Sequence, residues 1–465
     1  MTNKTENTRE LITDMVTEIT AGREKSHILI RNVLDKYNYL PEYDRSFIKK
    51  VTEGTLERMI TIDYVINQFS KVPVNKMKPF IRSLMRMSVY QILYLDKVPD
   101  SAACNEAVKL AAKRGFGTLR GFVNGVLRNI ARGKETIVYP DKEKNPVEAM
   151  SVMYSLPKEL VKLLISQYGE NVAESVLQGY LMERPVCVRV SQAVSEEEKS
   201  KILHNWEKLG MEVSLHPWLS YAYNLISTGS LKEDDNFCDG LYTVQDISSM
   251  LVGEIADYKS GDYVVDVCSA PGGKALHACD RLGDSGIVDA RDVSNSKIEL
   301  ILENKDRMHA DNLKVKVWDA RIKDESILHK ADIVLLDIPC SGLGVIGRKP
   351  AIKYRLAQNL NSFAELDCLQ KEIVDCVVDY VKPGGTLIYS TCTLRKEENE
   401  QMVSYLKDTY GFEAESLDSY LPEELKNSDT KKGYLTLLPS EKSDGFFIAR
   451  LKAPGVYKYE YMVET

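Results

Sequence analysis

The spacing of apolar residues divides the chain into a helical first part and a later part in which strands and helices alternate. Between residues 119 and 130, apolar side chains recur at intervals of three and four, which places them on one face of a helix. Residues 81–95 show a looser version of the same spacing, and no long strand pattern competes before residue 135. We therefore predict an all-α domain over residues 1–135.

Residues 136–235 are predicted to form a linker and a small α+β middle domain. The segment 133–146 is polar and contains two prolines, which is typical of a linker. The order of the elements beyond it predicts a compact β-α-β unit. These elements are helices over 160–168 and 172–181, strands over 186–190 and 211–215, and a helix between the strands that begins at Ser195 with Glu198 three residues later.

Residues 236–453 show the alternation of short β-type runs and helical segments that is typical of a doubly wound, mostly parallel α/β sheet. A late run over 445–451 is predicted to lie at an antiparallel edge of that sheet. The other predicted strands cover 263–267, 286–289, 314–318, 333–336 and 386–389.

Composition excludes several classes of protein. Apolar residues make up 44% of the 465, which is enough for ordinary cores, and no stretch is apolar and long enough to span a bilayer. The polar residues 1–7 lack the apolar centre of a signal peptide. Nine scattered cysteines without CxxC pairs and six isolated histidines favour reduced thiols and no metal site. We expect a cytoplasmic protein that neither enters a membrane nor binds a metal.

Charge is distributed unevenly along the chain. The net charge is −7, yet residues 76–134 contain twelve Lys and Arg against three acids, a local balance of +9. A basic segment on an acidic protein indicates a docking surface for a polyanion. Solvated helix faces, which are often rich in Lys and Arg, explain the same count.

A glycine-rich turn and acids follow the predicted strands. Ligands bind beyond the carboxyl ends of strands in an open parallel sheet. The turn consists of Cys268, Ser269, Ala270, Pro271, Gly272, Gly273 and Lys274 and opens a helix, so backbone can approach a ligand and an anionic group is favoured. It lacks the GxxxxGK[ST] spacing of a phosphate loop.

The acids that follow the next strands point to a nucleoside-like ligand. Asp292 is placed to accept hydrogen bonds from ribose hydroxyls, and Asp319 from an adenine amino group. Each alone is also an ordinary turn residue, but their placement at successive strand ends favours the binding role.

Two cysteines lie in polar turns after strands. Cys340 follows the strand that ends near Asp337, and Cys392 follows the run 386–389. A thiolate is the strongest side-chain nucleophile at neutral pH. Covalent chemistry, a disulfide pair and coincidence all remain open from the residues alone. Six other cysteines are expected to be small buried apolar residues: Cys104, Cys187, Cys238, Cys279, Cys368 and Cys376.

Several segments resemble the motifs of RNA cytosine-C5 methyltransferases, in that family's order. They are 266–274, 337–344, 389–393 and 397–400, with 244–249 and 443–447 flanking them. Segments 44–48 and 122–129 resemble the helical NusB-type RNA-binding domain. The combination is similar to bacterial 16S ribosomal RNA methyltransferases that carry a NusB-like domain. It implies an α/β Rossmann-like, S-adenosylmethionine-dependent methyltransferase domain after the helical and middle domains.

The resemblance also implies roles for individual residues. Cys392 is the nucleophile that attacks cytosine C6, Cys340 assists product release, Asp337 bonds the N3/N4 edge of the base, and Lys274 holds the base or favours the Cys392 thiolate. The implied partner is 16S ribosomal RNA, bound by a monomer. The implied S-adenosyl-L-methionine site consists of Cys268, Ser269, Ala270, Pro271, Gly272, Gly273, Lys274, Asp292, Asp319 and Asp337.

Three alternatives remain at this point. The substrate could be transfer RNA or another RNA. The chain could be a non-catalytic RNA-binding assembly factor, although both cysteines and all the acids are present. It could also be a DNA cytosine methyltransferase, in which Cys340 would attack instead of Cys392.

Overall fold

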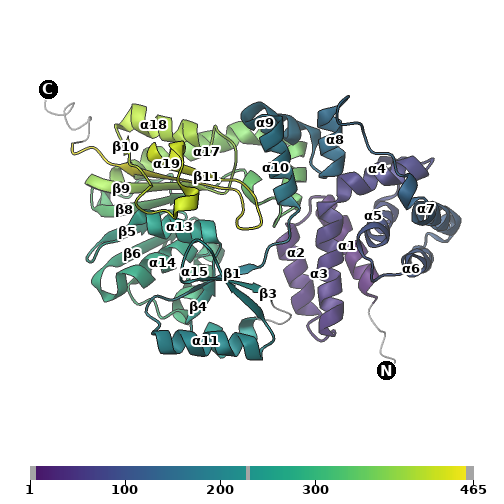
Figure 1. Cartoon of the computed structure of the whole chain (residues 1–465), viewed down its shortest axis with the longest axis horizontal. Coiled ribbons are helices and arrows are strands. Elements are labelled where there is room, and N and C mark those ends of the chain that lie inside the picture. Colours follow the sequence, from purple (N-terminus) through teal and green to yellow (C-terminus); the bar gives the residue numbers. More distant parts are fainter. Residues whose placement is uncertain (1–6, 227–230, 457–465) are drawn as a thin grey trace. The chain divides into compact units, whose positions relative to one another are not determined.

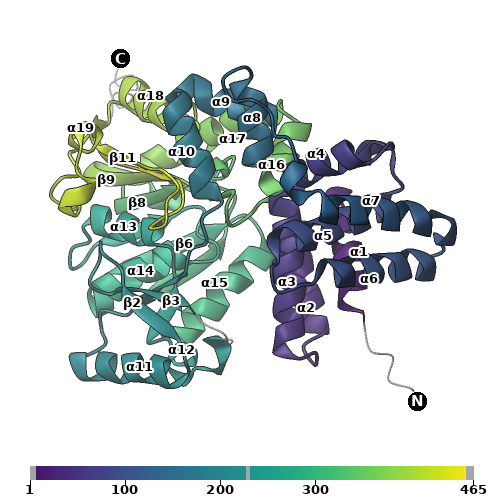
Figure 2. The same ribbon diagram turned by 45° about the vertical axis from the view of Figure 1, so that its right-hand side comes forward.

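The computed structural model describes residues 7–226 and 231–456, and the polar first six residues lie outside it. The chain divides into two compact units. The first, here the helical unit, contains the residues up to 181 together with 346–360, and the second, the sheet unit, contains 182–345 and the residues from 361 onward. Figures 1 and 2 show the secondary structure of both.

The helical unit contains no strand among its described residues, which confirms the all-α prediction. In α7 the buried residues Val123, Val126, Leu127 and Ile130 form the face that the spacing predicted. The α-helices are α1 Thr8–Thr20, α2 Ser26–Lys36, α3 Glu42–Glu57, α4 Met59–Phe69, α5 Pro79–Tyr94, α6 Asp100–Lys113, α7 Arg120–Arg132, α8 Pro146–Met153, α9 Lys158–Tyr168, α10 Glu170–Tyr180 and α16 Ala351–Gln358. Short 3-10 helices are η1 Val74–Lys76, η2 Gly117–Leu119 and η3 Lys134–Thr136.

Helix α16 comes from the later part of the sequence but packs inside the helical unit. Lys353 Nζ donates to the carbonyl of Glu57 at 2.6 Å, and the Tyr354 hydroxyl donates to the carbonyl of Leu56 at 2.6 Å. These carbonyls end α3 and have no partner within their own helix. Burial lowers the pKa of Lys353 to about 7. The segment that follows the Cys340 turn is thus anchored among the N-terminal helices.

A small antiparallel sheet with strand order β2-β3-β1-β4 begins the sheet unit. The capping box at Ser195 is confirmed. The predicted β-α-β unit was incomplete, because β3 lies between β1 and β2 and was not recognised in the sequence. The elements are β1 Val186–Val190, α11 Glu196–Lys208, β2 Glu212–Leu215, β3 Ala222–Ile226, η4 Leu231–Glu233, α12 Asp235–Cys238 and β4 Tyr242–Val244.

Because the structure divides into two units rather than the three predicted domains, it does not test the predicted boundaries at residues 135 and 235, which stay predictions. Helices α8–α10 lie in the helical unit, whereas the small sheet lies in the sheet unit.

The large sheet has the strand order β10-β12-β9-β8-β5-β6-β7, and β11 pairs with β12. Neighbouring strands from β9 to β7 are parallel, and β12 runs antiparallel to β9. The late strand is therefore antiparallel as predicted but not at the edge, because β10 and β11 pair with it. The strands are β5 Tyr263–Asp266, β6 Ile287–Asp292, β7 Leu313–Val317, β8 Ala331–Asp337, β9 Val381–Thr391, β10 Glu413–Ala414, β11 Tyr434–Leu437 and β12 Phe446–Lys452.

Helices cover both faces of this sheet (Figure 1). Val264 and Ile333 pack with α13–α15 on one face, while their neighbours Val265 and Val334 pack with α17 and α18 on the other. This alternation is that of a doubly wound sheet, which confirms the predicted fold class. The remaining helices are α13 Ile247–Ala256, α14 Gly273–Leu282, η5 Gly283–Ser285, α15 Asn295–Arg307, η6 Glu325–Ile327, η7 Leu343–Val345, α17 Ser362–Val377, η8 Val378–Tyr380, α18 Glu400–Tyr410, η9 Glu423–Leu425 and α19 Ser428–Lys431.

None of the helices within residues 7–226 and 231–456 has the length and apolar character needed to cross a membrane.

Candidate active site

Two thiols meet at the carboxyl ends of neighbouring parallel strands. Strands β8 and β9 pair in register up to Asp337 opposite Ser390, so the turns that follow them lie side by side. The sulfur atoms of Cys340 and Cys392 are 3.1 Å apart. The hydrogen bond with Cys392, together with burial, raises the pKa of Cys340 well above its ordinary value. Cys340 therefore keeps its proton at neutral pH.

A half-buried ion pair lies at the same strand ends. Lys274, in the first turn of α14, donates from Nζ to Asp337 Oδ2 at 2.7 Å. The other oxygen, Oδ1, accepts from the Ser390 hydroxyl at 2.8 Å. Burial alone would lower the pKa of Lys274, but the Asp337 carboxylate outweighs burial and raises it. The ammonium is therefore charged, and it also interacts electrostatically with Cys392.

The glycine-rich turn connects β5 to α14. Gly272 has φ of +100°, in the left-handed region that favours glycine, and its N–H donates to the Ser269 carbonyl at 2.7 Å. The tight turn lets α14 begin at once, with its unpaired N–H groups at the strand end. Asp292, the last residue of β6, accepts from the Ala270 N–H at 3.0 Å and from Lys297 at 2.8 Å. The structure thus joins the turn to Asp292.

Asp266, the last residue of β5, lies just before this turn. Its side chain is fully buried, and neither carboxylate oxygen has a hydrogen-bond partner among the described residues; the buried Ser269 hydroxyl lacks one as well. Burial raises the pKa of Asp266 to about 7, and the positive charge of Lys274 only partly opposes this. Buried polar atoms without partners are rare in proteins and indicate a place for water or a polar ligand.

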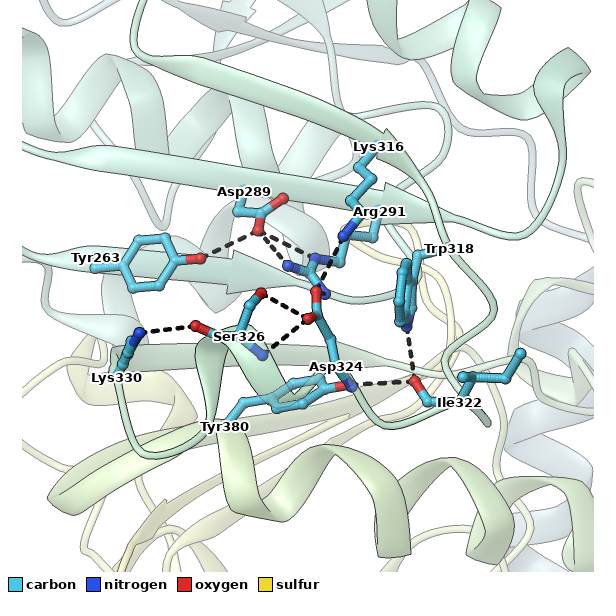
Figure 3. Close-up of polar contacts among 10 residues, drawn as sticks. All are labelled: Tyr263, Asp289, Arg291, Lys316, Trp318, Ile322, Asp324, Ser326, Lys330 and Tyr380. Carbon is cyan, nitrogen blue, oxygen red and sulfur yellow. Dashed lines mark hydrogen bonds and ion pairs between the residues drawn. The ribbon is translucent and has the colours of Figure 1, made fainter.

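Asp319 lies in the loop after β7, where its carboxylate is held by Arg321, with a 2.7 Å contact to Nη2. This hydrogen bond lowers the pKa of Asp319. A polar network anchors the same loop (Figure 3). In it, Asp324 Oδ2 accepts from Arg291 at 2.9 Å and from Lys316 at 3.0 Å, and the Asp324 N–H donates to the Tyr380 hydroxyl at 2.8 Å.

The backbones of the two cysteine turns also touch β12. The Gly344 N–H donates to the Cys392 carbonyl at 2.9 Å, and the Gly445 N–H donates to the Gly344 carbonyl at 2.9 Å. A Cβ on Gly344 would overlap Gly445, so the approach requires glycine. Three segments that are distant in sequence thereby fix one another.

The predicted site residues fall into two groups. Lys274, Asp337, Cys340 and Cys392 come together at the ends of β8 and β9, and Asp292 joins the glycine-rich turn. Asp319 stays bound to Arg321, a partner that sequence reasoning missed although it lies two residues away. Ser390 was also missed, and the strand register opposite Asp337 is the signal that could have identified it.

Three of the other cysteines differ from expectation. Cys238 and Cys368 are exposed and Cys376 is only half-buried, so the prediction that they are buried was wrong, whereas Cys104, Cys187 and Cys279 are buried. Cys368 lies on the outward face of α17, because Gln370 and Ile373 occupy its inward face. Among the described residues there is no group of three or more His, Cys, Asp or Glu side chains that could hold a metal ion.

Some of the basic residues in the helical unit are neutralised by acids that precede them in the sequence. Arg86 pairs with Asp63, and Arg114 with Asp14. Lys109, which pairs with Glu106 at 2.8 Å, and Arg120 line an open groove of about 570 Å³ along α6, η2 and α7. Its lining residues are Asn105, Val108, Lys109, Gly117, Arg120, Gly121 and Asn124.

Comparison with known proteins places this chain in one family. The family model described as 16S rRNA methyltransferase RsmB/F matches residues 254–452, and the NusB family model matches residues 6–132. A Bacillus subtilis (strain 168) protein called probable ribosomal RNA small subunit methyltransferase B is 34% identical over 451 residues, which cover 96% of this chain and 99% of the relative. A Synechocystis protein of the same name is 31% identical over 453 residues, again 96% and 99% of the two chains.

The fold over nearly the whole chain also occurs in a solved structure. The crystal structure of PH0851 aligns with a TM-score of 0.77 and 24% identity, covering 95% of this chain and 98% of that one. With the two relatives, these findings show that the chain belongs to the RsmB/F family of RNA methyltransferases, with a NusB domain ahead of the methyltransferase domain. The resemblance to 16S ribosomal RNA methyltransferases with a NusB-like domain is confirmed.

Proposed function

We propose that this protein transfers a methyl group from S-adenosylmethionine to C5 of a cytosine in 16S ribosomal RNA, through a covalent bond between Cys392 and C6 of the base. The observation that carries the proposal is the pair of thiols 3.1 Å apart beside the Lys274–Asp337 ion pair. Two thiols and a lysine at one strand edge suit a reaction with a nucleophile and a later release step.

The first step requires a thiolate. The resemblance makes Cys392 the member of the pair that ionises, and the Cys340 S–H and the Lys274 ammonium lie beside it to stabilise the charge. Its sulfur bonds to C6, and the electron pair of the C5–C6 double bond moves into the ring. Asp337, already oriented by Lys274 and Ser390, is placed for the N3/N4 edge of the cytosine.

C5 would then bond to the methyl group, while the bond from that carbon to the sulfonium sulfur of the cofactor breaks with its electron pair left on the sulfur. The C5 proton then leaves to solvent, its electron pair restores the C5–C6 double bond, and the C6–S bond breaks with its pair returning to Cys392, whose thiolate the Cys340 S–H stabilises by a hydrogen bond. A stacked base would have to leave its helix to reach these side chains, so single-stranded or loop RNA is the cheaper substrate.

The residues present fit S-adenosylmethionine. The orphaned oxygens of Asp266 and Ser269 offer acceptors to a cationic or hydroxyl-bearing ligand, and the backbone of the turn at Gly272 is open to it. We assign the cofactor site to Cys268–Lys274, Asp292, Asp319 and Asp337. When bound, the cofactor supplies an electrophilic methyl sulfonium. Asp319 would accept from the adenine only by sharing its carboxylate with Arg321.

The helical unit is proposed to bind the RNA backbone. The groove beside Lys109 and Arg120 has polar side chains, and the NusB match covers these helices. Cationic grooves bind polyanions through phosphate contacts that carry no sequence information.

The mechanism is tested with Cys392→Ala and Cys340→Ala proteins, unmethylated 16S ribosomal RNA and radiolabelled S-adenosylmethionine. Cys392→Ala should form no covalent species, because it lacks the attacking sulfur. Cys340→Ala should form the bond, transfer the methyl group and stall, so that a labelled protein–RNA band survives denaturing electrophoresis.

The same gel distinguishes the alternatives. An adduct from Cys392→Ala but none from Cys340→Ala would reverse the two roles, as in a DNA-type enzyme. If the wild-type protein methylates transfer RNA but not 16S ribosomal RNA, the proposed substrate is wrong. Absence of any adduct or product on all RNAs tested would favour a non-catalytic assembly factor.

A further inference from the structure

A fully buried carboxylate lies directly beneath the two cysteine turns. Glu398 Oε2 accepts from the Ser341 N–H at 2.8 Å and from Gln370 Nε2 at 2.9 Å. The same Gln370 nitrogen donates to the Pro339 carbonyl at 2.9 Å. Glu398 and Gln370 therefore hold the backbone on both sides of Cys340.

The residue after Glu398 holds the other turn in the same way. Asn399 Oδ1 accepts from the Thr391 hydroxyl at 2.6 Å, and Asn399 Nδ2 donates to the Thr393 carbonyl at 3.0 Å. These contacts lie on the two sides of Cys392. The hydroxyls of Ser341 and Thr393, 2.6 Å apart, connect one turn to the other. Glu398 thus holds the turn that carries Cys340, and the next residue, Asn399, holds the turn that carries Cys392.

Burying the Glu398 carboxylate costs free energy that a purely structural contact would not require. Burial raises the pKa of Glu398, although the Ser341 hydrogen bonds and the charge of Arg395 oppose this. Arg395 lies 3.6 Å from Glu398 Oε1, and its guanidinium is already bound to Asp367 at 2.6 and 2.7 Å. A buried charge is weak evidence for stability, because apolar packing at such a position is often as favourable. Perturbed carboxylates concentrate at functional sites instead.

We propose that Glu398 is a positioning residue for the second half of the reaction, in that it holds Cys340 at the distance from Cys392 that product release requires. The inference rests on the proposed function. Removing the carboxylate frees the Ser341 N–H and loosens the Cys340 turn. Asn399 continues to hold Cys392, so the attack on C6 and methyl transfer are retained.

The test compares Glu398→Ala, Glu398→Gln and the matched control Glu397→Gln with Cys340→Ala. Glu397 is the neighbouring carboxylate, and it contacts Arg395 at 3.3 Å. Each protein is mixed with unmethylated 16S ribosomal RNA and radiolabelled S-adenosylmethionine. Methyl transfer in a single turnover, multiple-turnover rate and denaturant-resistant adduct are measured.

We expect Glu398→Ala to lose about tenfold or more in multiple turnover while single-turnover methyl transfer falls less than about threefold, which is the effect of misplacing one group. The labelled adduct should accumulate, as with Cys340→Ala. Glu398→Gln retains an acceptor oxygen for Ser341 and should be partly rescued. Glu397→Gln should resemble the wild-type protein.

Two outcomes would overturn the inference. One is turnover by both Glu398 variants at the wild-type rate. The other is a parallel loss of single-turnover transfer and turnover without adduct, as expected of general structural damage. If Glu398→Ala does not fold, Glu398→Gln alone decides between these results. Absence of product from the wild-type protein would refute the proposed function instead, so the two failures are distinguishable.

Discussion

Replacing Asp266 by Asn should stabilise the sheet unit, and more so at alkaline than at acidic pH. The wild-type carboxyl is fully buried without hydrogen-bond partners among the described residues, and its pKa is raised to about 7 from 3.8. The native state therefore holds the proton more tightly than the unfolded state does. Asn has the shape of the protonated acid and cannot ionise.

The magnitude follows from linkage. A group whose pKa is raised on folding costs nothing below its unfolded value, and the cost grows as pH rises toward its folded value. At about 1.4 kcal/mol per unit of pKa, the shift costs the wild-type protein about 2 kcal/mol at pH 5 and about 4 kcal/mol at pH 8. The advantage of Asp266→Asn should therefore grow by about 2–3 kcal/mol between these pH values and level off above pH 7.

Urea unfolding measured at several pH values tests this prediction. The chain has three tryptophans, Trp206, Trp218 and Trp318, and all lie in the sheet unit. Tryptophan fluorescence therefore reports the unfolding of that unit and not of the helical unit. The difference in midpoint between variant and wild type, multiplied by the slope, gives the difference in unfolding free energy.

An exposed aspartate provides the control. Asp311 lies on the loop before β7, and Asp311→Asn should leave the pH dependence unchanged. A constant difference between Asp266→Asn and wild type from pH 5 to pH 8 would refute the reasoning, because it would mean that Asp266 is equally ionised in the native and unfolded states. A variant less stable than wild type at pH 8 would refute it as well.

Two further predictions concern the basic groove and the Asp324 network. Replacing Lys109 and Arg120 by Ala should weaken RNA binding and reduce the slope of log affinity against log salt by about 1 for each phosphate that the protein no longer neutralises. The control Arg23→Ala, outside the groove, should leave both unchanged. If a filter-binding titration shows the same slope for the double variant and the wild type, the groove does not bind RNA. Although burial opposes it, the bonds from Ser326, Lys316 and Arg291 lower the pKa of Asp324, so its contribution is present above about pH 4 and lost as pH falls. Asp324→Asn should cost about 3 kcal/mol at pH 7 and less at low pH, measured by tryptophan fluorescence; an equal cost at pH 7 and pH 3 would contradict this.

The sequence predicted best what depends on local periodicity. The helical face of α7 and the runs that became β5–β9 follow from the spacing of apolar residues. β3 was missed although it is as long as β1, because it contains Asn224, a residue type that is depleted in strands. The position of α16 could not be predicted, since its place in the helical unit depends on contacts from Lys353 and Tyr354 to residues almost 300 positions earlier.

In the candidate site, the residues that we propose to react could be named from the sequence, but the residues that hold them could not. Cys340, Cys392, Asp337 and Lys274 stand in recognisable motifs at strand ends. Glu398 also stands in a motif, but its contacts to Ser341 and Gln370 arise only when three separate segments meet. Asp266 was noted only as a motif residue, because burial without a partner is a property of the fold.

Charge at the strand edge shows why composition is a poor guide to this protein. From a net charge of −7, one would expect the chain to repel RNA, and the acids of the candidate site would add to that repulsion. Each of these carboxylates instead lies beside a cation or, at Asp266, has a pKa near 7 that favours a retained proton. Opposite charges this close largely cancel at the distance of a phosphate, particularly in salt. The offsetting pairs are Asp337 with Lys274, Asp292 with Lys297, Asp319 with Arg321, and Asp324 with Arg291 and Lys316.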